Sequence, residues 1–228
     1  MIFDPMYLLF MAPAFLLSLL ASWRTKSAFK KYSRVRSARN ITGAQAAQTM
    51  LANAGIRDVQ VVPTRGYLSD HYNPTNKTLA LSEPVYSQPT VAAVGVACHE
   101  AGHAIQHAKG YAPMWVRSAI VPFAGIGSQL GMWVMILGLF MSQTMVLVGA
   151  ILFSAVVLFQ LVTLPVEFDA SARAKKLAFE QGLVTQSERK GVAAVLNAAA
   201  MTYVAAAVSS IVTLLYFLLR SGLLGGRD

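Results

Sequence analysis

The chain contains the sequence His99-Glu100-Ala101-Gly102-His103, which has the pattern H-E-x-x-H. Residues four apart lie on one face of a helix, so His99 and His103 can both bind one small cation. Glu100, one position further round, can then take a proton from a water molecule on that cation. Asp and Glu number only ten in 228 residues, and two of the four His flank this Glu. The spacing indicates a metal site with a general base, although such a pentapeptide also occurs by chance on helices.

The composition predicts an integral membrane protein. Hydrophobic residues make up 55% of the chain, charged residues 13%, and the mean hydropathy is +0.51, which is too apolar for a soluble globular domain. Four spans are expected, over residues 7–23, 119–141, 145–164 and about 198–219. A polar turn at 142–144 would join the middle two into a hairpin, and Pro165 is expected to end the third. The last span is the least apolar at its start.

The basic residues predict how the chain lies in the membrane. The net charge is +9. A basic excess can indicate nucleic-acid binding, but these side chains lie beside apolar segments, so no nucleic-acid partner is expected. Of nineteen Lys and Arg, twelve lie in 24–118 and five in 165–197, whereas the turn 142–144 has none. The positive-inside rule therefore places both basic segments in the cytoplasm and both termini outside.

A third metal ligand is expected, because catalytic zinc usually has three protein ligands and an open position. The candidates outside the motif are Asp70, His71, Glu83, His107, Glu167 and Asp169. His107 continues the same helix, and one straight helix cannot wrap three ligands round one ion. Topology favours Glu167, because two spans separate it from the motif and an even number returns the chain to the same side. The alternative is an interfacial acid paired with Arg173 or Lys175.

Local patterns predict the elements around the motif. Residues 90–108 should form the central helix, with Thr90 as its N-cap. A further helix should open at Thr42. Short strands are expected over 59–62 and 78–82, separated by turn-forming residues. We expect them to pair as a small antiparallel sheet beside the central helix, with the edge of 78–82 holding an extended substrate.

Several further motifs resemble those of one family. They are Gly66 with Ser69-Asp70-His71-Tyr72 and Pro74-Thr75, Leu81 to Tyr86, Gln106-His107, Leu164 to Phe168, and Leu196 to Ala200 with Thr202-Tyr203. With H-E-x-x-H they resemble the YugP-like neutral zinc metallopeptidases, which are bacterial membrane proteins, nearly from end to end. The chain is more distantly similar to the HtpX and CAAX-prenyl-protease type, which adds a downstream E-x-x-x-D.

The resemblance implies roles for the site residues. It makes His99, His103 and Glu167 the ligands of Zn²⁺ and Glu100 the base. Ser171 stands where the E-x-x-x-D pattern has its aspartate. A carboxylate usually supports a metal-binding His, so Asp169 or Asp70 is a candidate replacement. His71 and Tyr203 are candidates for stabilising the oxyanion of the transition state.

The expected fold is a mainly α integral membrane protein with about four transmembrane helices and a zincin-like catalytic domain on the cytoplasmic side. Its expected segments are a membrane anchor (1–23), a cytoplasmic catalytic segment (24–118), a transmembrane hairpin (119–164), a cytoplasmic segment with the third zinc ligand (165–197) and a C-terminal membrane helix and tail (198–228). The single cysteine, Cys98, excludes an intrachain disulfide and is expected to be a small buried residue.

The expected function is a membrane-bound zinc endopeptidase of the bacterial inner membrane, acting on membrane or membrane-associated proteins. The lipid bilayer and a protein or peptide substrate are its expected partners, and a membrane-protein partner or a homo-oligomer is left open. One alternative is a non-catalytic, zinc-stabilised membrane scaffold, but such a site has no need of Glu100. Another is an intramembrane protease, but only eight apolar residues precede His99 in its helix, too few to span.

Overall fold

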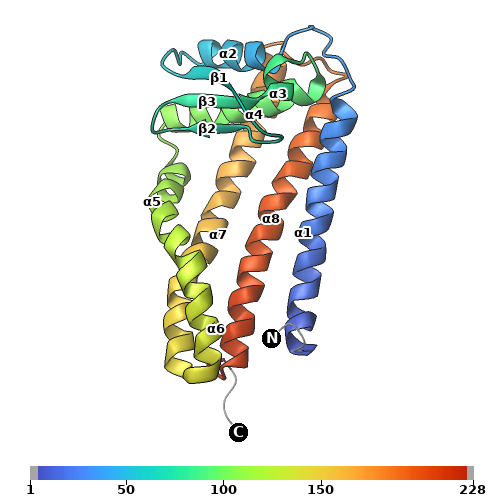
Figure 1. The fold of residues 1–228 in the computed structure, drawn as a ribbon. Coiled ribbons are helices and arrows are strands. Elements are labelled where there is room, and N and C mark those ends of the chain that lie inside the picture. The colour runs from blue at the N-terminus through green and yellow to red at the C-terminus, as the bar shows by residue number, and fades with distance from the viewer. Residues whose placement is uncertain (1–4, 225–228) are drawn as a thin grey trace. The chain divides into compact units, whose positions relative to one another are not determined.

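The computed structural model describes residues 5–224, so the ends of the first and last expected segments lie outside the described residues (Figure 1). The chain is mainly helical and divides into two compact units. Unit 1 takes the described parts of 1–21, 115–164 and 202–228. Unit 2 combines 22–114 with 165–201 and contains the H-E-x-x-H motif.

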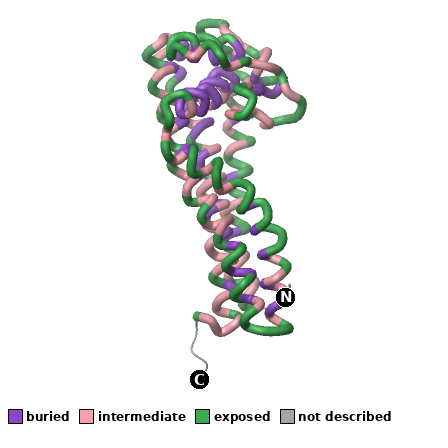
Figure 2. The backbone as a smooth tube through the Cα atoms, turned by 90° about the vertical axis from the view of Figure 1, so that its left-hand side faces the viewer, coloured by how far each residue is buried: buried purple, intermediate pink, exposed green. Residues whose placement is uncertain are grey.

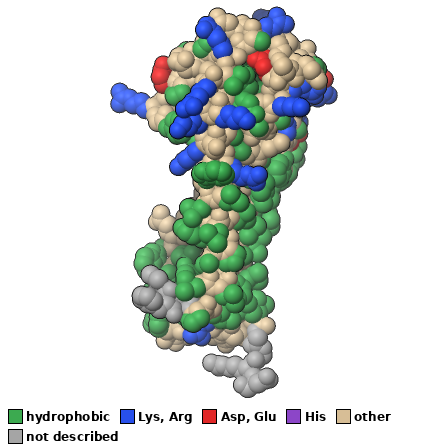
Figure 3. All heavy atoms as spheres, turned by 90° about the vertical axis from the view of Figure 1, so that its right-hand side faces the viewer, with side chains coloured by type: hydrophobic (Ala, Val, Ile, Leu, Met, Phe, Trp, Pro, Cys, Tyr) green, Lys and Arg blue, Asp and Glu red, His purple; other side chains and the backbone are tan. Residues whose placement is uncertain are grey.

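Four helical stretches among the described residues are long and apolar enough to cross a membrane. They are α1 (Pro5–Tyr32), the stretch Ala112–Met141, α7 (Gln143–Glu180) and α8 (Arg189–Arg220). At most 28% of the residues in the most apolar window of each are buried. On the face that Figure 3 draws, hydrophobic side chains cover much of the surface of the lower part. The expectation of four apolar helices is confirmed.

The boundaries of these helices differ from the expected ones. Pro165 does not end the third, because α7 continues through it to Glu180. A proline removes only one backbone hydrogen bond, and a long helix tolerates that loss where its surroundings compensate. The expected turn at 142–144 shrinks, since only Ser142 separates α7 from α6 (Met132–Met141). Before α6, helix α5 (Ala112–Ile126) passes into a π-helical turn, η1 (Gly127–Gly131).

The sheet of unit 2 has the strand order β1-β3-β2, formed by β1 (Gln60–Thr64), β2 (His71–Asn73) and β3 (Thr78–Ser82). The expected antiparallel pairing of the first and last strands is wrong, because β1 runs parallel to β3. The loop between them contains β2, which pairs antiparallel with β3, so the chain reverses twice. Since β3 is the central strand, its edges are occupied and do not offer the expected substrate-binding edge.

Helix α4 (Val91–Ala108) is the centre of unit 2. Its N-cap is Thr90, as expected, whose Oγ1 accepts a hydrogen bond from the backbone N–H of Ala93. Fourteen of its eighteen residues are buried, and Figure 2 shows this stretch in purple. Helix α2 (Gly43–Asn53), helix α3 (Glu83–Ser87), β2 and β3 all contact it. Cys98 is buried here, and burial raises the pKa of its thiol to about 12, in agreement with its expected role.

Candidate metal centre

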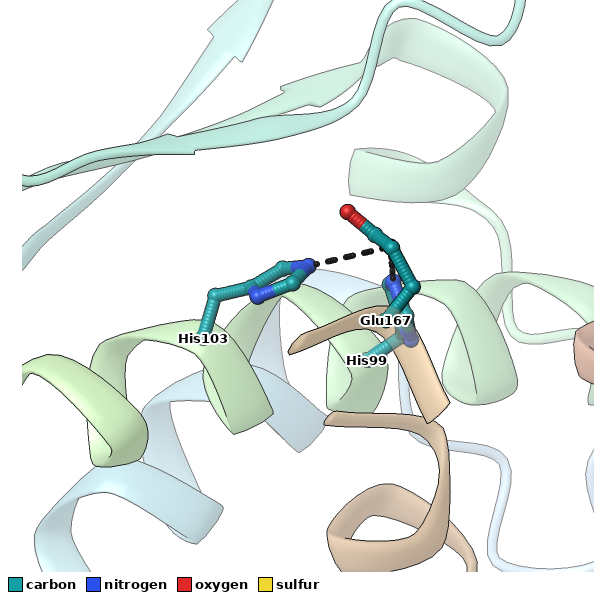
Figure 4. Close-up of side chains that lie close together, drawn as sticks. All are labelled: His99, His103 and Glu167. Carbon is teal, nitrogen blue, oxygen red and sulfur yellow. Dashed lines mark hydrogen bonds and ion pairs between the residues drawn. The ribbon is translucent and has the colours of Figure 1, made fainter. Parts of the chain in front are cut away.

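Three side chains from two helices converge on one point in unit 2 (Figure 4). His99 and His103 project from α4, and Glu167 projects from α7. Oε2 of Glu167 lies 3.2 Å from Nε2 of His99 and 3.4 Å from Nε2 of His103. One ligand atom from each residue lies within 4.8 Å of the other two. This donor set of two imidazoles and one carboxylate can hold a metal ion.

Close packing of α4 against α7 brings Glu167 to the two His. A Cβ atom on Gly102 would lie only 2.8 Å from the backbone oxygen of Ala170. Ala170 follows Glu167 by three positions, so the two lie on the same face of α7. The glycine inside the motif therefore permits the helix contact on which the third side chain depends.

The site is largely closed to solvent. The side chains of His99, His103 and Glu167 are 13%, 8% and 3% exposed. Burial lowers the pKa of His103, but the hydrogen bond and charge of Glu167 outweigh it, so the pKa lies above its usual value. Glu100 is buried on the same helix. Its burial raises the pKa of its carboxyl group, and the two His offset only part of this effect.

Gln106 joins His103 to α7, a role that the sequence motifs did not predict. Its Oε1 lies 3.0 Å from Nδ1 of His103, and its Nε2 donates hydrogen bonds to the backbone oxygen of Val166 and to Oδ2 of Asp169, each at 2.8 Å. The sequence signal for this role is that Gln106 follows His103 by three positions, because residues three apart on a helix are neighbours. A buried polar residue one turn after a candidate ligand is well placed to support it.

Ser171 supports the other histidine. Its Oγ lies 3.1 Å from Nδ1 of His99. Ser171 occupies the aspartate position of the E-x-x-x-D pattern, and it therefore makes the histidine contact that a carboxylate was expected to make. Asp169 contacts Gln106 and pairs with Nε of Arg173 at 2.5 Å. Its hydrogen bond to Gln106 links it to His103.

The remaining candidates lie elsewhere among the described residues. Asp70 accepts hydrogen bonds from the backbone N–H and the hydroxyl of Ser82, and burial raises its pKa. His71 is exposed on β2, with Nδ1 2.9 Å from the oxygen of Ser69.

His107 bonds the hydroxyl of Tyr72 at 2.8 Å and is outside the cluster. Glu83 is exposed at the start of α3, and Tyr203 lies on α8 in unit 1, where its role stays a prediction.

Comparison with known proteins shows the family of this chain. The family described as "Putative neutral zinc metallopeptidase" matches residues 7–222, nearly the whole chain. The chain belongs to this family. It is also similar to the "Putative membrane protease YugP" of Bacillus subtilis (strain 168), with 45% identity over 216 residues that cover 93% of this chain and 94% of that protein. The resemblance drawn from the motifs is thereby confirmed. No solved structure matches the chain.

Proposed function

We propose that this protein is a membrane-bound zinc endopeptidase in which His99, His103 and Glu167 bind the metal. The separation of their ligand atoms carries the proposal. A tetrahedral ion with bonds of about 2.0–2.1 Å places neighbouring ligand atoms about 3.3 Å apart. The two distances from Oε2 of Glu167 to the imidazole nitrogens are 3.2 and 3.4 Å. Two of the three separations therefore match a zinc ion, and all three ligand atoms lie within 4.8 Å of one another. Membership of a zinc metallopeptidase family supports that choice of metal.

Glu100 is the proposed general base. A bound zinc ion supplies Lewis acidity toward water and toward a peptide carbonyl. The carboxylate of Glu100 takes the proton from the attacking water and passes it to the leaving amine. Burial favours this role, because a raised pKa brings the carboxyl group closer to the neutral pH at which it must both accept and release a proton. A site of this kind is gluzincin-like.

The proposed location is the bacterial plasma membrane, with the site on the cytoplasmic side. The four apolar helices support insertion, the distribution of Lys and Arg supports the orientation, and the Bacillus relative is named a membrane protease. The proposed substrates are peptide bonds of membrane or membrane-associated proteins. The non-catalytic scaffold remains the alternative that an experiment must exclude.

Substitution of Glu100 by Gln tests the proposal. We expect Glu100→Gln to retain zinc, measured by mass spectrometry of the metal, and to lose cleavage of a peptide library by at least about 100-fold. Glu180→Gln is the matched control, because its side chain is 52% exposed on α7, and it should keep full activity. Equal cleavage by Glu100→Gln and wild type would refute the peptidase and leave the scaffold.

A further inference from the structure

We infer that Gln106 and Ser171 are the positioning residues of the metal centre, and that they hold its two histidines through neutral groups instead of carboxylates. This inference rests on the proposed function, because it concerns the same metal. Its consequence can be measured without any substrate. The site should bind zinc more weakly with serine at position 171 than with a carboxylate there.

The bonds of Gln106 fix the orientation of its amide. Both partners of Nε2, the backbone oxygen of Val166 and Oδ2 of Asp169, can only accept hydrogen bonds. Nε2 must therefore be the donor there, which leaves Oε1 facing His103. Since an amide oxygen only accepts, Nδ1 of His103 carries a proton, and Nε2, which lies 3.4 Å from Oε2 of Glu167, is the nitrogen left to bind a metal. Gln106 is fully buried, so water cannot replace these bonds.

Ser171 performs the same task for His99 from the other helix. Its hydroxyl is buried beside Nδ1 of His99, while Nε2 of that ring faces Glu167. The oxygen of a hydroxyl can accept a hydrogen bond from Nδ1–H, which leaves Nε2 as the nitrogen that can bind the metal. Ser171 follows Glu167 by four positions and lies on the same face of α7. One turn of this helix thus supplies both a ligand and the group that orients another.

Both acceptors are uncharged. Asp169, the carboxylate that is hydrogen-bonded to Gln106, already pairs with Arg173, whose guanidinium lies 5.8 Å from the ring centre of Tyr111. Asp169 hydrogen-bonds the neutral amide of Gln106, and it is this amide that contacts His103. Carboxylate partners raise the basicity of metal-binding imidazoles, and loss of such supporting groups typically costs 10–100-fold in metal affinity. The hydroxyl of Ser171 raises the basicity of the His99 imidazole less than a carboxylate would. A carboxylate at position 171 should therefore increase the affinity for the metal.

The experiment measures zinc affinity of the full-length chain in detergent by competition with a chromophoric chelator. Gln106→Met and Ser171→Ala should each bind zinc about 10–100-fold more weakly than wild type. Ser171→Asp should bind it more tightly, by a factor of about 10 or more. A merely structural role for Ser171 predicts no such gain.

Matched controls carry the same chemical changes away from the site. They are Gln48→Met on the exposed face of α2, Ser37→Ala at a buried hydroxyl with no hydrogen-bond partner, and Ser187→Asp on the surface. Their zinc affinity should equal that of wild type. Thermal melting of each metal-free protein reports on folding. If Gln106→Met does not fold, Asp169→Ala tests the same network at its half-buried end and should weaken binding by a few-fold.

The outcomes separate this inference from the proposed function. Unchanged affinity in Gln106→Met and Ser171→Ala, or no gain in Ser171→Asp, overturns the positioning role while the metal site stands. Absence of zinc binding by wild type overturns the metal centre itself.

Discussion

Gly102 lies against the backbone of Ala170, so that a Cβ atom at Gly102 would come within 2.8 Å of the Ala170 oxygen. This contact joins the helix with the two histidines to the helix with Glu167, within unit 2. Normal van der Waals contact requires more than 3 Å between such atoms. The metal site therefore depends on a residue that has no side chain.

Gly102→Ala should separate α4 from α7 and displace Glu167 from the histidines. Overpacking of this kind typically costs about 1–3 kcal/mol, and here the backbone of α7 must move. We expect a lower melting temperature and a zinc content well below that of wild type. Gly125→Ala is the control, because a Cβ there meets nothing within 4 Å and alanine is the better helix former. Full zinc occupancy in Gly102→Ala would contradict this role of the contact.

Much of this site could be predicted from the sequence because its signals are local or topological. The H-E-x-x-H spacing and the Thr90 cap define α4. Counting spans predicts that Glu167 and the motif share one side of the membrane, and Glu167 does lie beside the two histidines. Two features could not be predicted in this way. The parallel pairing of β1 with β3 depends on β2, a strand of three residues too short to give a pattern. The role of Gln106 depends on long-range contacts with α7.

Removal of zinc should destabilise the protein as well as inactivate it. A ligand that binds only the folded state stabilises it by about 2.7 kcal/mol at 100 times its Kd. Wild type should therefore melt at a higher temperature with zinc than after treatment with a chelator. His103→Ala should melt at the same temperature in both conditions, because the imidazole within 3.4 Å of Glu167 is gone. A zinc-dependent shift of equal size in His103→Ala would show that the metal binds elsewhere.

Glu188 should make unit 2 sensitive to acid. Burial raises the pKa of Glu188, but hydrogen bonds from the hydroxyl and backbone N–H of Thr185 and the backbone N–H of Ala38 outweigh it, so the pKa lies below its usual value of 4.5. A carboxyl whose folded pKa is depressed stabilises the fold above its unfolded pKa. That stability is lost as the pH falls below about 4.5 through the folded pKa.

Melting curves at several pH values test this effect. Glu188→Gln should be less stable than wild type at pH 7 by about 1–2 kcal/mol, because charge-assisted hydrogen bonds are lost. The difference should shrink as the pH falls below about 4.5, through the folded pKa at which wild type protonates. Glu180→Gln is the control, since its exposed pair with Lys176 at 3.9 Å contributes little. A difference that stays constant over this range would assign the loss to packing instead.

Asp70 and Asp169 should respond differently to removal of their carboxylates. Asp70 holds the backbone N–H and hydroxyl of Ser82, at 2.8 and 2.9 Å, so Asp70→Ala leaves buried donors unpaired. This should cost about 1–3 kcal/mol of stability and leave zinc affinity unchanged, because Asp70 touches no histidine of the cluster. Asp169→Ala should weaken zinc binding through Gln106, with a smaller change in melting temperature because Asp169 is 29% exposed. Weaker zinc binding in folded Asp70→Ala would instead make Asp70 a supporting carboxylate of the metal centre.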